Sequence, residues 1–342
     1  MSGPYLSRRA FLRLALLSGI GLSLATLRWQ AGSFDPMAFV RWTLRRSWRA
    51  LSGARSTVAV APCPSYEHDV LAALRGGWDD LGAPSLRGQR VVLKPNLVSY
   101  IPGPPGNTHA TVVEAAIALC RLQGAADVVV AEGMAFVRDA APILQQSGLA
   151  TVLAATGARF VDLNYDDVVE VPLAGRYTAL RTLSLPRTIV DADCVISLAK
   201  MKTHHWAGLS LSMKNLFGVV PGLRYGWPKN ALHVAGLDLM ILELLETIRP
   251  RWAIVDGVVG MEGDGPLYGS PVPSGALVMG QDLVAVDATC SRLMGMGLDA
   301  TGFDHVQFAQ AVGLGWAEPE RIDVRGAAVA SLARTYARAP GY

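Results

Sequence analysis

The stretch Asp193–Gly218, which reads DCVISLAKMKTHHWAGLSLSMKNLFG, decides the fold that we expect for this chain. It begins with the apolar run 194–198, whose β-branched residues are typical of a strand buried on both faces of a parallel sheet. Ligands of open α/β sheets bind at the carboxyl ends of such strands. The polar residues that crowd this strand end are Lys200, Lys202, Thr203, His204, His205, Lys214 and Asn215.

Side chains alternate between the two faces of a strand, so a strand that continues past residue 198 places every second residue on the same side. One face would then hold Lys200, Lys202 and His204, and the other Met201, Thr203 and His205. Two ammonium groups and an imidazole would crowd one spot. We therefore expect a ligand site here, against the simpler interpretation of a solvated strand end.

Lysine is used selectively in this chain. Of its 31 basic residues only five are lysines, and three of these, Lys200, Lys202 and Lys214, lie within fifteen residues of one another. Because lysine is a compact charge whose pKa shifts on burial, this clustering predicts a cationic pocket for an anion. The expected anion contacts are Lys94, Asn96, Lys202 and Asn215. Neighbouring acids would also offset the repulsion between lysines, and the candidates for such a purely structural network are Glu132, Asp256 and Asp264.

A longer motif string runs through this region. It reads VISLAKMKTHHWAGLSLSMKNLFGVVPG from Val195, YGWPKNALH from Tyr225 and AIVDGVVGMEGDGP from Ala253. The string resembles the family known as domain of unknown function 362, and the resemblance covers about Val58 to Gly297. Some members of that family carry ferredoxin-like iron–sulfur modules. This chain has no C-x-x-C pair, so the resemblance implies no such cofactor here.

Alternating strand and helix patterns predict a doubly wound α/β fold, with a largely parallel sheet, helices on both faces and a small antiparallel excursion. The expected strands are 57–61, 90–93, 127–131, 160–163, 194–198, 252–255 and 276–279, with 168–171 and 180–185 as the excursion. The expected helices are 67–81, 111–123, 140–155, 231–248, 283–293 and 303–312. Thr111 and Glu114 have capping-box spacing, and 257–269 is expected to form a glycine-rich loop.

Four of the expected strands end in charged residues, which are Lys94, Glu132, Lys200 with Lys202, and Asp256. Since the carboxyl ends of parallel strands meet at one edge, these charges are expected to line a common cleft. The lysines would neutralise a substrate carboxylate or phosphate, while imidazole and carboxylate groups would move protons. The candidate catalytic residues are Lys200, Lys202, His204, Lys214 and Asp256.

Imidazole and carboxylate groups also suit a divalent metal, which is the one cofactor that the sequence favours. His109 is expected beside the amino terminus of a helix, where the helix dipole favours a neutral imidazole. The alternative to metal binding by His109 is a helix-capping role, and the alternative for Asp264 is a plain surface loop. The candidate metal ligands are His109, His204, His205, Asp256 and Asp264.

The N-terminal segment 1–30 differs from the rest of the chain in its pattern. Residues 7–13 read SRRAFLR and precede a charge-free apolar run at 14–27. This combination resembles a twin-arginine export signal, and fourteen residues are too few for a comfortable transmembrane helix. The segment would carry the protein through the twin-arginine machinery to the periplasm, or remain attached as a membrane tether.

The region 31–55 contains FVRWTLRRSWRAL at residues 39–51, which predicts a basic, aromatic, amphipathic helix. Such a helix suits an anionic membrane surface, and the alternative is a helix packed on the body of the protein. The length of the remaining chain fits one large domain over 56–330, followed by a C-terminal tail over 331–342.

Charge is distributed unevenly along the chain. Residues 1–55 carry nine arginines and one acid, for a charge of +8, and the remainder carries 22 basic and 27 acidic residues, for −5, which together give +3. An acidic body argues against nucleic-acid binding, which requires a basic face. The four cysteines match no zinc or redox spacing. Cys120 and Cys194 are expected in the core, and a disulfide remains open.

The sequence therefore predicts an exported or membrane-tethered α/β enzyme that acts on an anionic small molecule with the assistance of a metal. Two alternatives remain, a non-catalytic anion-binding protein at the membrane surface and a metal-containing redox partner. Ser210 and Ser212 lie near Lys214, but no base and orienting group accompany them, so nucleophilic catalysis is not favoured.

Overall fold

The computed structural model describes residues 36–229, 232–233, 236–298 and 304–340. Its centre is a nine-stranded mixed sheet with the strand order β11-β1-β10-β9-β7-β2-β3-β4, and β8 pairs with the extended end of β7. Neighbouring strands are parallel in the pairs β1–β11, β2–β3, β2–β7, β3–β4 and β7–β9. The pairs β1–β10, β9–β10 and β7–β8 are antiparallel, so the sheet is mixed but mostly parallel.

The strands are β1 (Ser56–Pro62), β2 (Arg90–Pro95), β3 (Asp127–Glu132), β4 (Arg159–Asp162), β5 (Val168–Pro172), β6 (Thr182–Pro186), β7 (Cys194–His204), β8 (Gly208–Ser210), β9 (Trp252–Glu262), β10 (Ser270–Gly280) and β11 (Ile322–Gly326). The α-helices are α2 (Pro36–Leu51), α3 (Val70–Asp80), α4 (Ala110–Leu122), α5 (Ala141–Gln146), α6 (Leu149–Thr156), α7 (Arg187–Val190), α8 (Ser212–Asn215), α9 (Gly222–Tyr225), α11 (Leu237–Ile248), α12 (Leu283–Leu293), α13 (Asp304–Ala311) and α14 (Val329–Leu332).

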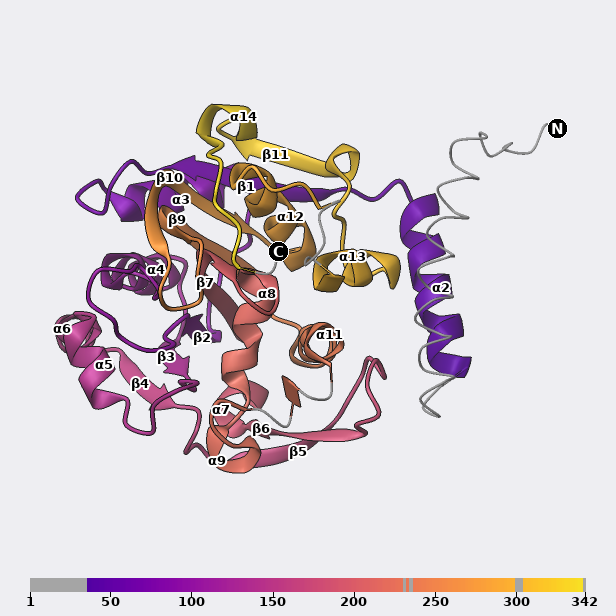
Figure 1. The fold of residues 1–342 in the computed structure, drawn as a ribbon, viewed down its shortest axis with the longest axis horizontal. Helices are drawn as coiled ribbons and strands as arrows, with labels where there is room; N and C mark the ends of the chain where they lie inside the picture. The colour runs from indigo at the N-terminus through magenta and orange to yellow at the C-terminus, as the bar shows by residue number, and fades with distance from the viewer. Residues whose placement is uncertain (1–35, 230–231, 234–235, 299–303, 341–342) are drawn as a thin grey trace.

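Helices cover both faces of the main sheet (Figure 1), which confirms the predicted doubly wound architecture. The strands supply alternate residues to two apolar cores, because a strand points successive side chains to opposite faces. In β1, Val58 and Val60 belong to the core under α11, α12 and α13, whereas Ala59 and Ala61 belong to the core under α3 and α4. The predicted excursion is also confirmed, since β5 and β6 form a separate antiparallel sheet.

The glycine-rich segment 257–269, predicted as a loop, is strand as far as Glu262, and only 263–269 forms the connection to β10. β9 continues to Glu262 and pairs with β10 from Ala253 to Glu262, with a register shift after Gly257. The glycines serve close packing. A Cβ at Gly257 would lie 2.6 Å from Met201 Cε, and one at Gly260 would collide with the hydroxyl of Tyr336. The prediction was wrong for 257–262, because glycine marks close approach as well as turns.

Two helix predictions need correction. The single helix expected over 140–155 is divided into α5 and α6 by Gly148, whose φ of 77° lies in the left-handed region that favours glycine. The capping box expected from Thr111 and Glu114 does not form. His109 is the N-cap of α4, and its Nδ1 accepts a hydrogen bond from the backbone N–H of Thr111 at 3.3 Å.

Helix α2 packs on the body of the protein. Its arginines bind the body, as the second of the two interpretations of this segment predicted. Trp42 is buried and stacks on Tyr177 with ring centroids 4.9 Å apart. Arg45 pairs with Glu246 at 2.7 Å. The segment 1–30, with the predicted export signal, lies outside the described residues. Among those that are described, no helix is long and apolar enough to cross a membrane.

The predicted C-terminal tail contributes to the core as far as it is described. Tyr336 is buried, its hydroxyl hydrogen-bonds Ser274 at 2.7 Å, and its backbone N–H binds the carbonyl of Met294. All four cysteines are buried and free, in agreement with the core role expected for Cys120 and Cys194.

Candidate functional site

The charged strand ends come together at one edge of the sheet, as predicted. Strands β9, β7, β2 and β3 are consecutive neighbours, and each carries a buried charged residue. Lys200 and Asp256 lie where the continuous parallel register of β7 and β9 stops, although these strands run on to His204 and Glu262. The register places Lys200 of β7 directly beside Asp256 of β9. The parallel order brings Lys94 of β2 next to the end of β3, which carries Glu132. The four charges therefore form two ion pairs.

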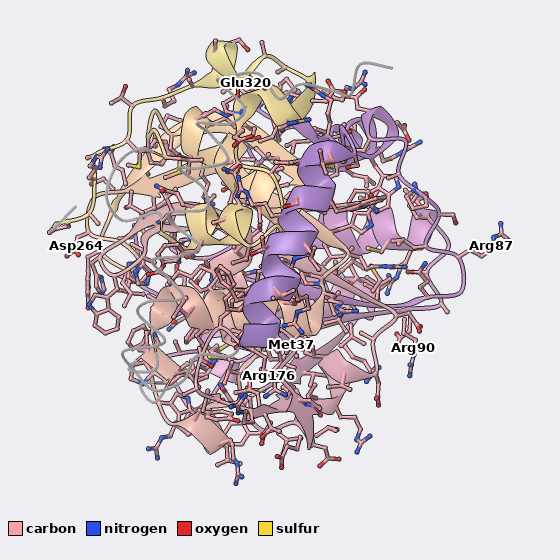
Figure 2. All side chains as sticks on the ribbon, turned by 90° about the vertical axis from the view of Figure 1, so that its right-hand side faces the viewer. Met37, Arg87, Arg90, Arg176, Asp264 and Glu320 are labelled. Atoms are coloured by element: carbon pink, nitrogen blue, oxygen red, sulfur yellow. The ribbon has the colours of Figure 1, made fainter. Side chains whose placement is uncertain are left out.

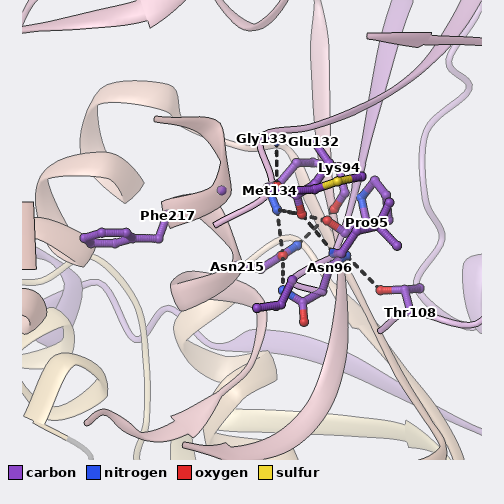
Figure 3. A network of polar contacts seen from close by, with 12 residues as sticks. Lys94, Pro95, Asn96, Thr108, Glu132, Gly133, Met134, Asn215 and Phe217 are labelled. Carbon is purple, nitrogen blue, oxygen red and sulfur yellow. Dashed lines mark hydrogen bonds and ion pairs between the residues drawn. The ribbon is translucent and has the colours of Figure 1, made fainter. Parts of the chain in front are cut away.

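The first ion pair joins Lys94 to Glu132, with Nζ and Oε2 2.6 Å apart in the network of Figure 3. Lys94 Nζ also donates to Asn215 Oδ1 at 2.8 Å, and Glu132 accepts from the backbone N–H groups of Leu97 and Gly133. Burial lowers the pKa of Lys94, and the Glu132 carboxylate offsets part of that effect. The pair is fully enclosed, so it positions neighbouring groups and holds its own charge neutral.

Two amides fix the orientation of this network. Asn215 accepts from Lys94 Nζ through Oδ1 and donates through Nδ2 to the Lys94 carbonyl and to Ser197 Oγ. Asn96 must therefore turn its Nδ2 to Asn215 Oδ1, at 3.2 Å. Its own Oδ1 is buried and has no hydrogen-bond partner among the described residues. A buried acceptor without a hydrogen bond lowers the free energy of unfolding by about 1–3 kcal/mol.

The second ion pair, Lys200 with Asp256, belongs to a different network. Nζ lies 2.9 Å from Asp256 Oδ2 and 2.7 Å from the hydroxyl of Tyr66, which itself donates to Asp256. Tyr66 stacks on His109 with ring centroids 3.7 Å apart. Burial lowers the pKa of His109, and the nearby Lys200 adds to this effect. These groups line a cavity of about 220 Å³.

Lys202 is buried and contacts residues that line two different cavities. Its ammonium group donates to the carbonyl of Gly106, at 2.6 Å, and to that of Pro266, at 3.4 Å. It forms no ion pair with a described acid. Burial and the neighbouring lysines, Lys214 first, hold the pKa of Lys202 well below its usual value.

The larger cavity has a volume of about 420 Å³, which suits a small molecule. Two lysines line it. Lys214 lies 5.9 Å from the centre of the Phe217 ring and makes no hydrogen bond with any residue that the structure describes. Lys229 donates to the carbonyls of Gly133, at 2.6 Å, and Gly218, at 3.3 Å. Burial, followed by the charge of Lys94, lowers the pKa of Lys214 to about 8.

Lys229 combines a lowered pKa with an unusual backbone. Burial is the main reason that its pKa falls to about 7, and Glu132 offsets part of the effect. Its φ of 69° lies in the left-handed region, which a residue with a side chain adopts only when its surroundings impose it. The hydrogen bonds of its ammonium group to the Gly133 and Gly218 carbonyls are among the contacts that hold this conformation.

Three histidines complete the wall, and their hydrogen bonds fix their tautomers. Nδ1 of His205 lies 2.8 Å from the Gly265 carbonyl and Nδ1 of His233 lies 3.0 Å from the Lys229 carbonyl. A carbonyl only accepts, so both histidines carry a proton on Nδ1 and keep a lone pair on Nε2. His204 is the opposite tautomer, with its proton on Nε2, because its Nδ1 accepts a hydrogen bond from the Trp206 N–H. Burial lowers the pKa of His233, and that of His204 lies well below its usual value for the same reason, followed by the charge of Lys214.

The structure divides the site residues predicted from sequence between the two cavities. Those lining the larger cavity are Asn96, His204, His205, Lys214 and Asn215, and those in the smaller network are His109, Lys200 and Asp256. Lys94 and Lys202 are buried beside the larger cavity, and Asp264 is exposed. In the part of the chain that is described, no group of three or more histidines, cysteines or acids is placed to hold a metal. The five predicted ligands do not converge, so metal binding stays a prediction.

Three further residues of the site, Tyr66, Lys229 and His233, were not predicted from the sequence. Lys229 and His233 both lie in the motif YGWPKNALH, and the scarcity of lysine marked Lys229 as well. Tyr66 has no such signal, because it comes from a separate loop far away in the chain. The serine near Lys214 that could resemble a nucleophile, Ser212, instead donates to the buried Asp287 at 2.5 Å.

The fold and the site define an α/β protein with a cationic cavity at the carboxyl end of its sheet. A family model described as "Domain of unknown function (DUF362)" matches residues 91–292, and the chain belongs to this family. It is 32% identical over 261 residues to the "Thylakoid-associated protein sll1697" of Synechocystis sp., a match that covers 70% of this chain and 74% of that protein.

Among solved structures, the chain is similar to the lactate racemase apoprotein from Thermoanaerobacterium thermosaccharolyticum. The sequence identity is 12% and the TM-score is 0.41. The match covers 71% of this chain and 58% of the racemase, so the chain spans less than two thirds of that protein's length.

Proposed function

We propose that the 420 Å³ cavity binds a small carboxylate or phosphate compound and that the protein is an enzyme that moves a proton on it. The observation that carries this proposal is Lys214. Its ammonium group lines the cavity beside Lys229, and neither group forms an ion pair with a described acid. The one acid in the wall, Glu132, is already paired with Lys94. An anion is the ligand that would balance these charges.

The groups around the cavity have proton affinities suited to acid–base chemistry near neutral pH. The pKa of Lys229 is about 7 and that of Lys214 about 8, so each exchanges its proton in the physiological range. His205 and His233 offer Nε2 lone pairs, and His204 offers an Nε2–H donor. In this proposal Lys214 holds the anionic group, and Lys229 or one of the histidines gives or takes the proton.

A thermal-shift series tests anion binding. Sulfate, phosphate and citrate should raise the melting temperature of the wild type in a saturable way. At a hundredfold excess over Kd, a bound anion adds about 2.7 kcal/mol to the free energy of unfolding. Sodium chloride at matched ionic strength is the control. Lys214→Met should abolish the response, whereas Arg87→Met, which removes an exposed arginine that does not line the cavity, should leave it intact. Equal responses in both variants would refute the assignment.

Turnover separates an enzyme from a binding protein. The anion that stabilises the wild type most would be incubated with the protein in D₂O and followed by proton NMR. An enzyme yields product signals or loss of an exchangeable C–H signal. Lys229→Met should abolish that change and retain anion binding if Lys229 moves the proton, and His233→Gln should do so if His233 does. Saturable binding with no spectral change for any stabilising anion would assign the cavity to a non-catalytic binding protein.

We also propose that Arg8 and Arg9 direct export through the twin-arginine route, with the run 14–27 as the apolar part of the signal. The name of the Synechocystis relative, "Thylakoid-associated", supports a membrane-related location. Replacing both arginines by lysine should retain the protein in the cytoplasm. Cell fractionation checks this, and unchanged export of the double variant would contradict it.

A further inference from the structure

The outer face of α2 carries a stripe of exposed apolar side chains. Val40, Leu44, Trp48 and Leu51 are 47%, 64%, 71% and 78% exposed, respectively. Their spacing of four, four and three residues places them along one side of the helix. Figure 2 looks directly onto α2, which lies across the surface of the molecule. Four large apolar groups in one line are more than the scattered exposure that soluble surfaces normally show.

The opposite face of α2 is fixed to the body by its arginines. Arg45 binds Glu246, the hydroxyl of Tyr177 and the carbonyl of Val312, and Arg49 pairs with Asp282 at 3.1 Å. Trp42 is buried beneath the helix. These contacts prevent the helix from rotating to bury its apolar stripe. They also occupy the arginines that the sequence pattern alone would assign to lipid headgroups.

The chain that leads into α2 indicates what covers the stripe. Eight residues, 28–35, separate the charge-free run 14–27 from Pro36, at which α2 begins. Eight extended residues reach at most about 30 Å. If the run enters a bilayer, α2 is therefore held close to the bilayer surface. An apolar run of this length is a marginal span by itself, and a second apolar element beside it makes membrane attachment stable.

We propose that the stripe formed by Val40, Leu44, Trp48 and Leu51 binds a lipid bilayer, with its side chains inserted at the boundary between headgroups and acyl chains. Tryptophan is the residue best suited to this boundary. Because the arginines of α2 are directed toward the body, attachment depends on apolar burial rather than on anionic lipid. The full chain should therefore bind neutral vesicles, with little change on adding anionic lipid or salt.

Vesicle co-sedimentation of the full chain tests this proposal. The triple variant Leu44→Ser, Trp48→Ser and Leu51→Ser should partition at least about tenfold less onto phosphatidylcholine vesicles, since three apolar side chains are lost. The matched control is Leu122→Ser, Val168→Ser and Leu223→Ser, which removes three exposed apolar side chains elsewhere on the surface and should partition like the wild type. Equal partitioning of both triple variants would overturn the proposal.

Two further measurements exclude other partners for the stripe. Acyl chains brominated near the headgroup should quench a fluorescence component that Trp48→Phe removes, and no difference between wild type and variant would contradict insertion. Sedimentation velocity without lipid should give the same oligomeric state for wild type and stripe variant. A dimer that the stripe variant converts to monomer would instead assign the stripe to contact with a second copy, and would overturn the lipid assignment.

Discussion

Lys94 and Lys214 look alike in the sequence, but they differ in the partners that the structure gives them. Lys94 lies between Glu132 and Asn215, and its charge is satisfied inside the protein. Lys214 has no such partner among the described residues, and its pKa falls to about 8. The sequence left two alternatives for the lysines, an anion pocket and a structural ion network. The contacts fit the network for Lys94 and Lys200, and leave Lys214 as the residue on which an anion pocket depends.

The Lys94–Glu132 pair should respond differently to single and double substitution. Lys94→Met leaves Glu132 buried without its cation, which should lower the free energy of unfolding by about 3–5 kcal/mol. Lys94→Met with Glu132→Gln removes both charges and should lose much less. Urea unfolding at pH 7 measures both. A double variant as unstable as the single one would show that the loss comes from shape rather than from the uncompensated charge.

At the scale of elements, the turn that follows α8 is packed against the ion pair. A Cβ at Gly218 would collide with Glu132 Oε1 and Lys94 Nζ, and the Gly218 carbonyl accepts from the Gly133 N–H at 3.0 Å. The backbone itself thus forms part of the cavity wall. No sequence pattern distinguishes such a glycine from one in an ordinary turn, because both would be interpreted as turn signals.

Gly218→Ala should destabilise the protein by roughly 1–3 kcal/mol, because a methyl group has to displace a buried charged pair. Gly76→Ala is the matched control. Gly76 lies within α3, a Cβ there meets no atom within 4 Å, and the same substitution should stabilise the helix by up to about 1 kcal/mol. Thermal unfolding compares the two, and a neutral Gly218→Ala would contradict the packing described for this turn.

At the scale of the whole molecule, sequence periodicity predicted the sheet and its covering helices because burial on both faces leaves a strong pattern. It also predicted which edge carries the site, since charges followed four buried strands. It did not predict the two separate cavities. That division depends on which lysine meets which acid across β9, β7, β2 and β3, a long-range property that spacing along the chain does not encode. Tyr66 joins the smaller network for the same reason.

Proton uptake on anion binding shows whether Lys214 holds the anion. Below its pKa of about 8 the ammonium group is charged and attracts the anion, and as pH rises through 8 the charge and the affinity are lost. A bound anion raises this pKa, so sulfate binding at pH 8 should take up about half a proton per site. Calorimetric titration in buffers of different ionisation enthalpy measures that uptake. The wild type should take up protons and Lys214→Met should not. Binding without uptake, or equal uptake in both proteins, would show that Lys214 does not hold the anion.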